Sequence, residues 1–341
     1  MNQAALCLFL PQEKRKKTMR LAPDDGSCTL DAVRDAAARI APHARVTPVL
    51  RCASIDRISG VSLHFKAEHL QRVGAFKFRG ACNAVFSLDE ATAARGVVTQ
   101  SSGNHGAAVA LACRLRGIAA TVVVPRGAPQ VKLAVIADFG ARIVPCEASQ
   151  QDRDRVSAQV LEDTGGALVH PFDDPRVIAG QGTATLELMR QVPELDAIVV
   201  PVSGGGLLSG TLIAAKALNP GIEVFGAEPE GAADACASLR QGRRVVDMVP
   251  DTICDGLRAQ LSERTFSILS RHCDGILLAS DDEVRVAMRL LFERMKQVVE
   301  PSGAMALAAL LRARARFAGK RVGIVLSGGN LDLAALFSSG A

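Results

Sequence analysis

A run of glycines at residues 203–206 is the first feature of the sequence with a chemical use. Ser203-Gly204-Gly205-Gly206 stands between the apolar runs AIVVPV and LLSGTLIAAKAL, and Leu207 begins the second run. Consecutive glycines let the backbone turn its N–H groups toward one point, and the start of a following helix adds partial positive charge. The pattern has neither the Lys-Ser/Thr of a P-loop nor the spacing G-x-G-x-x-G, so it indicates neither a nucleoside triphosphate nor a dinucleotide. We expect a phosphate group here, and a tight turn without a ligand is the structural alternative.

Two further loops place hydroxyl and amide side chains after apolar runs. Ser101-Ser102-Gly103-Asn104-His105-Gly106 follows GVVTQ and opens a helical pattern, and Ser327-Gly328-Gly329-Asn330 follows RVGIVL. Hydroxyls, an amide and backbone N–H groups at a helix start suit a carboxylate. The alternatives are that Ser102 only caps the helix and that the last loop is a common turn.

Lys77 lies between Phe76 and Phe78 in the segment GAFKFRG. An ammonium group placed against apolar side chains has a lowered pKa, which is the condition for Schiff-base chemistry. A lysine that extends over an apolar patch toward water is the alternative.

The elements that must position these loops alternate between short β-branched runs and longer amphipathic stretches, which indicates an α/β fold with a mainly parallel sheet. Ligands gather at the carboxyl ends of strands in such sheets, where all three loops lie. Val61–Ala67 alternates apolar and polar residues, and we expect an edge or antiparallel strand there. The nine expected strands are Val61–Ala67, Gly96–Thr99, Ala120–Val124, Arg142–Cys146, Ala167–Pro171, Ala197–Val202, Glu223–Ala227, Gly275–Leu278 and Val322–Leu326.

Composition excludes several classes of protein. The chain has 341 residues, 48% hydrophobic and 22% charged, which suggests about two domains and argues against disorder. Residues 1–18 account for three of the five net positive charges, so the remainder is not a nucleic-acid-binding surface. The basic cluster of residues 1–18 follows its apolar stretch, the reverse of a secretory signal, and we expect a disordered extension there. Without an 18-residue apolar run or a C-x-x-C pair among nine Cys, we expect no membrane span and a cytoplasmic protein with reduced thiols.

Six segments, taken together in their order and spacing, resemble the pyridoxal-phosphate enzymes of the tryptophan-synthase-β fold (fold type II), and within these the serine/threonine dehydratase and serine racemase family. The segments are GAFKFRGA (74–81), SSGNHG (101–106), HPFDDPRVIAGQGT (170–183), PVSGGGLLSG (201–210), GAEPE (226–230) and VLSGGNLDL (325–333). The resemblance implies a two-domain α/β fold with mainly parallel twisted sheets flanked by helices. Residues 19–95 and 171–341 would form a large cofactor-binding domain, and residues 96–170 a small mobile domain.

The resemblance also implies roles for individual residues. Lys77 matches the lysine that forms a Schiff base with pyridoxal 5'-phosphate and acts as general base, and Ser102 matches the serine that racemases use on the opposite face of the substrate. Phe76 would lie against the pyridine ring, Asn104 would bond the phenolic oxygen, and Ser327 would meet the ring nitrogen. The residues expected at the cofactor are Phe76, Lys77, Asn104, Ser203, Gly204, Gly205, Gly206, Leu207 and Ser327, and those expected at the substrate carboxylate are Ser101, Ser102, Gly103, Asn104 and His105.

A divalent metal site is implied at Glu228, the carbonyl of Ala232, and Asp234, which match the metal site of serine racemases. Carboxylate and carbonyl oxygens are hard ligands that fit Mg²⁺ or Ca²⁺, with waters completing the shell. Two solvated acids at a strand end are the alternative.

Arg153 aligns with an arginine that approaches the substrate in serine racemases, although a solvated helix face is the alternative. A guanidinium there would suit a substrate with a second carboxylate, which keeps 3-hydroxyaspartate open. Arg72-Val73 stands where animal serine racemases have a Lys-Thr pair that binds a nucleotide, so we do not expect activation by ATP.

The leading expectation is the dehydration and deamination of L-serine and L-threonine to pyruvate and 2-oxobutyrate. Serine racemase and threo-3-hydroxyaspartate ammonia-lyase, which gives oxaloacetate, are alternatives within the same chemistry. A non-catalytic ligand sensor is an alternative of another class, against which the retained Lys77 argues. The expected partner is a small hydroxy amino acid, and the resemblance implies a homodimer.

Overall fold

A computed structural model gives the fold and describes residues 6–8 and 26–331. The strands are β1 (Leu6–Leu8), β2 (Val49–Leu50), β3 (Ser62–Lys66), β4 (Val97–Gln100), β5 (Ala120–Pro125), β6 (Arg142–Cys146), β7 (Ala167–Leu168), β8 (Ala197–Pro201), β9 (Glu223–Pro229), β10 (Gly275–Ala279) and β11 (Arg321–Val325). Within the described residues they form two sheets, one of seven strands in the order β1-β10-β9-β8-β11-β3-β2 and one of four in the order β6-β5-β4-β7. Only β1 with β10 and β2 with β3 pair antiparallel, so both sheets are mainly parallel, as expected.

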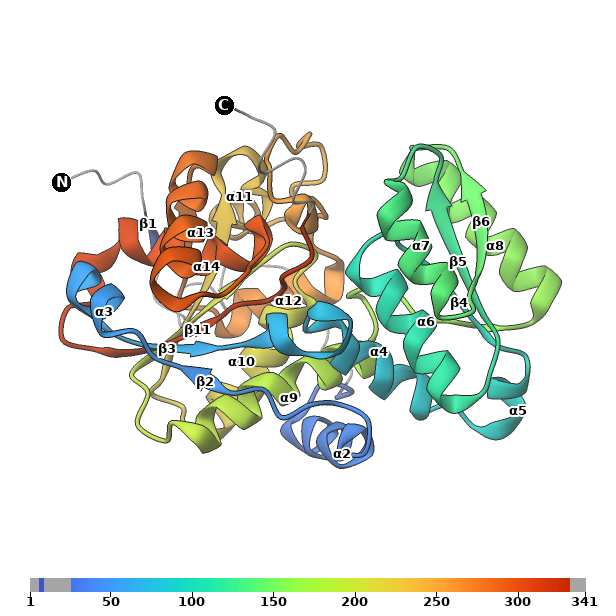
Figure 1. The fold of residues 1–341 in the computed structure, drawn as a ribbon, viewed down its shortest axis with the longest axis horizontal. Coiled ribbons are helices and arrows are strands. Elements are labelled where there is room, and N and C mark those ends of the chain that lie inside the picture. Colours follow the sequence, from blue (N-terminus) through green and yellow to red (C-terminus); the bar gives the residue numbers. More distant parts are fainter. Residues whose placement is uncertain (1–5, 9–25, 332–341) are drawn as a thin grey trace.

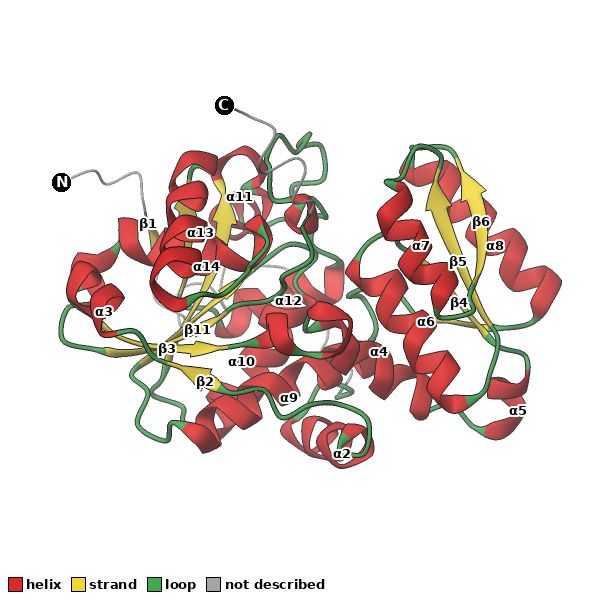
Figure 2. Cartoon of the chain, in the orientation of Figure 1, coloured by secondary structure: helices red, strands yellow, loops and turns green. Residues whose placement is uncertain are grey.

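Helices flank both sheets, and the two sheets occupy different halves of the molecule (Figures 1 and 2). The helices are α2 (Leu30–Ile40), α3 (Ala53–Ser59), α4 (Lys77–Phe86), α5 (Glu90–Ala94), α6 (Asn104–Arg116), α7 (Gln130–Asp138), α8 (Gln150–Thr164), α9 (Pro175–Gln191), α10 (Gly206–Leu218), α11 (Asp234–Gln241), α12 (Glu263–His272), α13 (Asp281–Met295) and α14 (Pro301–Arg312). Short 3-10 turns η2 (Glu68–Leu70), η3 (Arg72–Gly74), η4 (Glu230–Ala232), η5 (Asp255–Leu257) and η6 (Arg314–Phe317) complete the connections. Helix α4 packs on α6 of one half and on α9 of the other, so it joins the two halves.

The strands expected from the sequence are present, most with ends shifted by no more than two residues. The exception is β7, which ends at Leu168 although we expected the strand to continue to Pro171. Proline has no N–H to donate to a ladder, and the chain turns away toward α9 after Val169 bonds β4.

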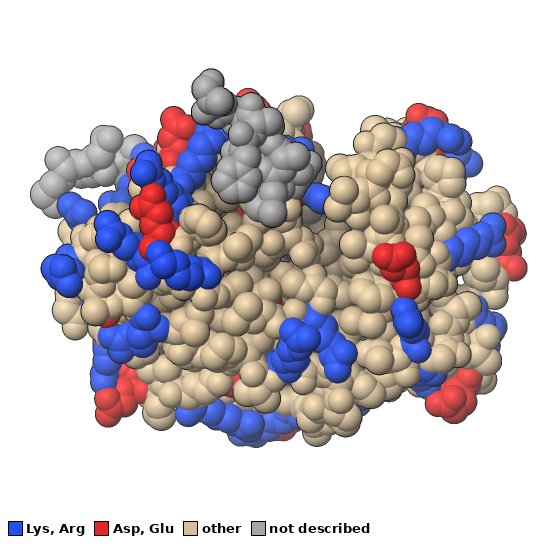
Figure 3. All heavy atoms as spheres, viewed as in Figure 1, with Lys and Arg blue, Asp and Glu red and all other residues tan. Residues whose placement is uncertain are grey.

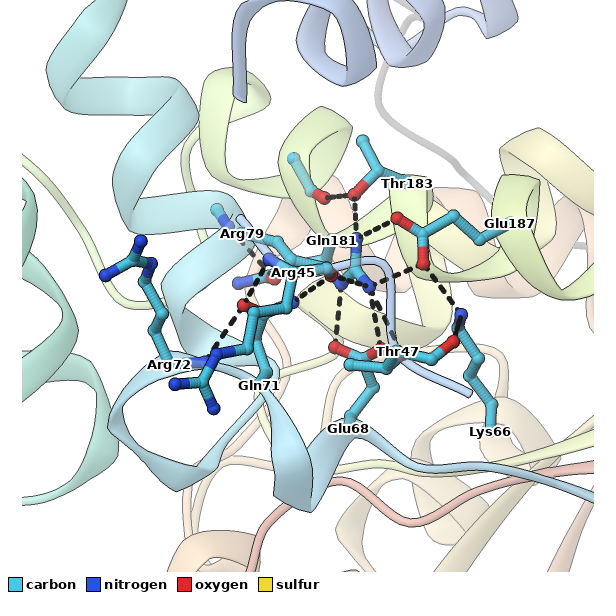
Figure 4. Close-up of polar contacts among 12 residues, drawn as sticks. Arg45, Thr47, Lys66, Glu68, Gln71, Arg72, Arg79, Gln181, Thr183 and Glu187 are labelled. Carbon is cyan, nitrogen blue, oxygen red and sulfur yellow. Dashed lines mark hydrogen bonds and ion pairs between the residues drawn. The ribbon is translucent and has the colours of Figure 1, made fainter. Parts of the chain in front are cut away.

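We expected Val61–Ala67 to form an edge or antiparallel strand whose polar residues face solvent. The strand β3 does pair antiparallel with β2, but it is not an edge strand and its polar face is not in solvent. It lies between β11, to which it is parallel, and the two-residue edge strand β2, to which it is antiparallel. Both His64 and Lys66 are buried. Lys66 Nζ donates to Glu187 Oε2 and to Thr47 O, each at 2.7 Å, as Figure 4 shows for the surrounding cluster. The alternation therefore marks a polar face covered by charged and polar partners, rather than a face in solvent.

The first residues of the chain also depart from the expectation. We expected residues 1–18 to lie outside the fold, but Leu6–Leu8 forms β1 at the edge of the larger sheet, with Leu6 opposite Leu277 of β10. A short apolar segment can extend a sheet edge through backbone pairing alone. The other residues of this expected extension lie outside the described residues.

One face of the molecule shows how its charges are distributed. On the face shown in Figure 3, Lys and Arg side chains are scattered and mixed with Asp and Glu, without a continuous basic stripe. Among the helices described, none has the length and apolar character needed to cross a bilayer.

Candidate active site

The three polar loops and Lys77 come from strands and helices of both halves. Ser101–Gly103 connects β4 to α6, residues 203–205 connect β8 to α10, and the loop from Ser327 follows β11. Phe76 N–H donates to Ser327 O at 3.0 Å, which places the start of α4 against the end of β11. Asn330 Nδ2 donates to Asn104 Oδ1 at 2.9 Å, which brings the loop after β11 to the first residue of α6. These contacts bring Asn104, Ser327 and the start of the helix that carries Lys77 close together.

Lys77 opens α4, and its side chain is half-buried. Nζ donates to Pro171 O at 2.8 Å and lies 5.3 Å from the centroid of the Phe76 ring. Among the described residues no carboxylate pairs with it, and burial lowers its pKa to about 8. A lysine near its pKa in a neutral surrounding has a sizeable unprotonated fraction near neutral pH, which is the form that attacks a carbonyl.

Two histidines lie near this amine and stay neutral. His105 is buried, and burial together with the charge of Lys77 lowers its pKa to about 3. Its Nε2 contacts Val169 O at 3.2 Å, while Nδ1 has no partner among the described residues. His170 Nδ1 accepts the N–H of Asp173 at 2.8 Å, and burial lowers its pKa as well. Neither imidazole adds positive charge that would compete with Lys77.

The glycine loop forms a cradle of backbone N–H groups. In the described chain the N–H groups of residues 204–207 have no backbone acceptor, and the start of α10 has no side-chain cap. Gly205 has φ +89, a conformation that favours glycine, and a Cβ on Gly204 would overlap the Phe172 ring. Ser203 Oγ accepts Ala259 N–H at 2.9 Å, so this side chain anchors the loop while the backbone stays open. Unpaired N–H groups at a helix start fit the phosphate of pyridoxal 5'-phosphate.

The loop at Ser101 also leads into a helix whose first N–H groups have no side-chain cap. Ser101 Oγ accepts Gly103 N–H at 3.2 Å, and helix α6 begins after Gly103 without a side-chain cap. Capping by Ser102 is therefore not observed, and its hydroxyl has no partner among the described residues. The loop thus offers a hydroxyl and helix-start N–H groups to a carboxylate.

Ser327 is buried at the end of β11 beside Phe76, and its hydroxyl also lacks a partner among the described residues. A serine hydroxyl can donate to an unprotonated ring nitrogen, as the resemblance implies for this position.

Arg153 is half-buried on the first turn of α8, which does not fit a fully solvated helix face. It lies close to the Cys146 thiol at the end of β6, where burial raises the pKa of the thiol and the charge of Arg153 opposes that rise. The neighbouring Asp154 accepts Gln100 Nε2 at 3.1 Å, and Gln100 directly precedes Ser101. This places the first turn of α8 beside the loop expected to hold the substrate carboxylate.

At the implied metal site, both carboxylates accept backbone N–H groups, but one oxygen of Asp234 has no partner among the described residues. Glu228 accepts the N–H groups of Ala235 and Cys236, each at 2.9 Å, at the start of α11. Asp234 is buried, its Oδ2 has no hydrogen-bond partner, and burial raises its pKa to about 6. A buried carboxylate oxygen without a partner is an atom that a cation would satisfy, and Ala232 lies in η4 between the two acids. In the described residues no three His, Cys, Asp or Glu side chains gather around one point, so carbonyl and water oxygens would have to complete the shell.

Sequence reasoning missed Glu300. It is buried before α14 and accepts Asn104 Nδ2 at 3.0 Å. Its only sequence signal is one acid inside the otherwise apolar run VVEPSGAMALAAL. It also missed the segment His170–Phe172 as part of the site, although this segment joins Lys77 to the glycine loop.

Comparison with known proteins gives the same family. Residues 40–328 match the model of the family described as pyridoxal-phosphate dependent enzyme. The chain is 49% identical over 312 residues to a serine racemase of Dictyostelium discoideum, covering 90% of this chain and 96% of the relative. It is 47% identical to a beta-hydroxyaspartate dehydratase of Paracoccus denitrificans, covering 86% of this chain and 94% of the relative. The solved structure of maize serine racemase superposes with a TM-score of 0.90 at 45% identity, covering 92% and 97% of the two chains.

The matched family model covers most of the chain, and the observed α/β architecture agrees with it. The chain belongs to the fold type II family of pyridoxal-phosphate dependent enzymes.

Proposed function

We propose that this enzyme removes the β-hydroxyl and the amino group from hydroxy amino acids, with L-serine and L-threonine as default substrates, and racemises serine at the same centre. The observation that carries the proposal is Lys77, whose amine bonds Pro171 O and whose pKa burial lowers to about 8, together with the Ser102 hydroxyl, which has no partner among the described residues. The similarity to serine racemases at 45–49% identity supports the racemase part.

The cofactor, when bound, supplies an electron-withdrawing ring that stabilises negative charge at the substrate Cα. Lys77 Nζ is the base that removes the Cα proton on its own face. The N–H groups at the start of α6, with the hydroxyls of Ser101 and Ser102, hold the substrate carboxylate. Ser102 Oγ returns a proton on the opposite face, which inverts the Cα. Neutral His105 adds no positive charge beside the amine.

Threo-3-hydroxyaspartate is the second candidate substrate, and the half-buried Arg153 favours it. A second substrate carboxylate would form a bidentate pair with the guanidinium, whereas the side chains of serine and threonine carry no charge that could pair with it. The similarity to a beta-hydroxyaspartate dehydratase supports this candidate.

We also propose that residues 96–170 move as a small domain against residues 19–95 and 171–341. The small sheet β6-β5-β4-β7 belongs wholly to the first of these ranges, which supports the division. For the metal, Asp234 Oδ2, a Glu228 oxygen and the Ala232 carbonyl would hold Mg²⁺ or Ca²⁺.

The test is a panel of L-serine, D-serine, L-threonine and L-threo-3-hydroxyaspartate, with the 2-oxo acid and the product stereochemistry measured, in Mg²⁺ and in EDTA. Lys77→Ala should abolish every activity and the visible absorption band that borohydride removes. Ser102→Ala should lose D-serine formation and keep elimination, while Arg153→Gln should lose activity on hydroxyaspartate selectively.

Each result has a contrary outcome. A band retained in Lys77→Ala would refute the assignment of the lysine, and oxaloacetate release far faster than pyruvate release would replace the default substrate by the second candidate. Equal rates in Mg²⁺ and EDTA would count against the metal site.

A further inference from the structure

Glu300 is a buried acid whose carboxylate contacts the site through Asn104. Asn104 Nδ2 lies 3.0 Å from Oε1 and 3.3 Å from Oε2, and Asn330 N–H donates to Oε2 at 3.0 Å. Glu300 precedes α14, but its side chain does not cap that helix. The ordinary structural role of an acid at a helix start therefore does not explain its burial.

Asn330 is the second residue that bonds the Asn104 side chain. Its Nδ2 donates both to Asn104 Oδ1 at 2.9 Å and to Val73 O at 2.6 Å. The Asn104 amide is thus fixed at both ends, with its nitrogen toward the carboxylate of Glu300 and its oxygen toward the amide of Asn330. A reversed Asn104 amide would put its oxygen against the carboxylate and its NH₂ against another NH₂. The two N–H bonds of an amide diverge too widely for both to point at the same carboxylate. One N–H of Asn104 therefore bonds Glu300, and the second N–H is left for another acceptor.

The backbone around these side chains is shaped to admit them. A Cβ on Gly328 would overlap the Glu300 carboxylate, and a Cβ on Gly74, which has φ +69, would lie 2.6 Å from Asn330 Oδ1. Val73 has φ 56, which is strained for a β-branched residue, and the bond from Asn330 to its carbonyl supports that conformation. The backbone strain at Val73, and the two positions where only glycine fits, indicate that the structure is shaped around Glu300 and Asn330.

We propose that Glu300 is a positioning residue that acts through Asn104, holding its amide so that the free N–H faces the phenolic oxygen of the bound cofactor. The inference rests on the cofactor placement proposed above. It assigns a function to a residue outside the motifs, since Glu300 is 196 positions from Asn104 in the sequence.

The burial of the Glu300 carboxylate has an energetic cost. It raises the pKa of Glu300 to about 7, with Asp255 acting in the same direction and the bonds from Asn104 and Asn330 and the charge of Lys132 opposing it. Burying a carboxylate is costly, and its two donors offset only part of the cost. A charged acceptor holds an amide more strongly than a neutral one, which is a reason for an acid at this position.

The test uses apoprotein and holoenzyme at pH 8, above the pKa of Glu300. Glu300→Gln keeps the shape but turns an NH₂ group toward its donors. It should weaken the binding of pyridoxal 5'-phosphate to apoprotein about tenfold and change the visible absorption of the reconstituted holoenzyme. Glu293→Gln, on an exposed acid of α13, is the control and should alter neither quantity.

A second variant separates positioning from support of the fold. Asn330→Ala removes the other hold on the same amide, so its loss of cofactor affinity should not add to that of Glu300→Gln in the double variant. The proposal is overturned if either folded variant binds the cofactor with wild-type affinity and spectrum, or if the two losses add. If Glu300→Gln does not fold, Glu300→Asp, which keeps the charge but draws the carboxylate away from Asn104, takes its place in the same two measurements with the same expected losses. Failure of the cofactor placement is distinguishable, because the wild-type band would then survive Lys77→Ala.

Discussion

At the scale of single residues, Lys77 combines reactivity with a cost in stability. Its folded pKa of about 8 lies below the usual 10.5, because burial disfavours the charged form. The contribution of Lys77 to stability is therefore present above pH 10.5 and is lost as the pH falls through 8.

Lys77→Met should accordingly stabilise the apoprotein at pH 7, by about 1–3 kcal/mol, with a gain that shrinks toward pH 10. The lost bond to Pro171 O reduces the gain. Urea unfolding of the apoprotein at the two pH values measures this. Equal destabilisation at both values would contradict the lowered pKa.

The sequence could predict the residues whose chemistry is carried by contiguous motifs. Lys77, the glycine loop and Asn104 each lie in a short segment where neighbouring residues set the backbone conformation. Glu300 carries no such pattern, because its role comes from a contact made only after distant segments fold together. The same reason explains Lys66. The alternation of apolar and polar residues around it predicts a side chain in solvent, but its partner Glu187 lies 121 positions away and covers it only in the folded chain.

At the scale of elements, a buried cluster of charges fixes the helix that carries Lys77. Arg79 of α4 donates to Glu68 Oε2 at 2.7 Å and to Glu187 Oε1 at 2.8 Å, and all three contact the region around Thr47 and Lys66 (Figure 4). Burial alone would raise the pKa of Glu68, but Arg79 and Lys66 hold it below the usual value. The cluster joins α4 to η2 and α9. It therefore fixes the position of α4, whose first residue is Lys77.

Arg79→Met should reduce the free energy of unfolding by about 3–5 kcal/mol, because it leaves Glu68 buried with less compensation. Arg79→Met combined with Glu68→Gln should recover part of that loss, since the neutral amide costs less to bury. Chemical denaturation of the holoenzyme compares the three proteins. If the double variant is less stable than Arg79→Met alone, the loss of stability comes from the lost bonding geometry of the cluster and not from the uncompensated charge of Glu68.

At the scale of the whole molecule, two kinds of contact join the halves. Helix α4 packs on both, and Asn104 of the smaller-sheet half bonds Glu300 of the other. Farther out, Lys132 of α7 forms an ion pair with Asp255 of η5. Both side chains of this pair are partly exposed, so it adds little to global stability but favours the arrangement in which the halves approach.

Asp255→Asn should therefore leave the unfolding midpoint nearly unchanged and raise the KM for the amino acid about two- to fivefold, because the open arrangement gains population. The wild-type KM should rise between low and high salt, and the KM of the variant should not, since salt screens an exposed pair. The matched control is Glu147→Gln, which removes an exposed ion pair with Arg126 inside residues 96–170 and should not change the salt dependence. If the variant keeps the salt dependence of the wild type, the pair does not favour closure, and closure depends on the buried contacts of α4 and Asn104.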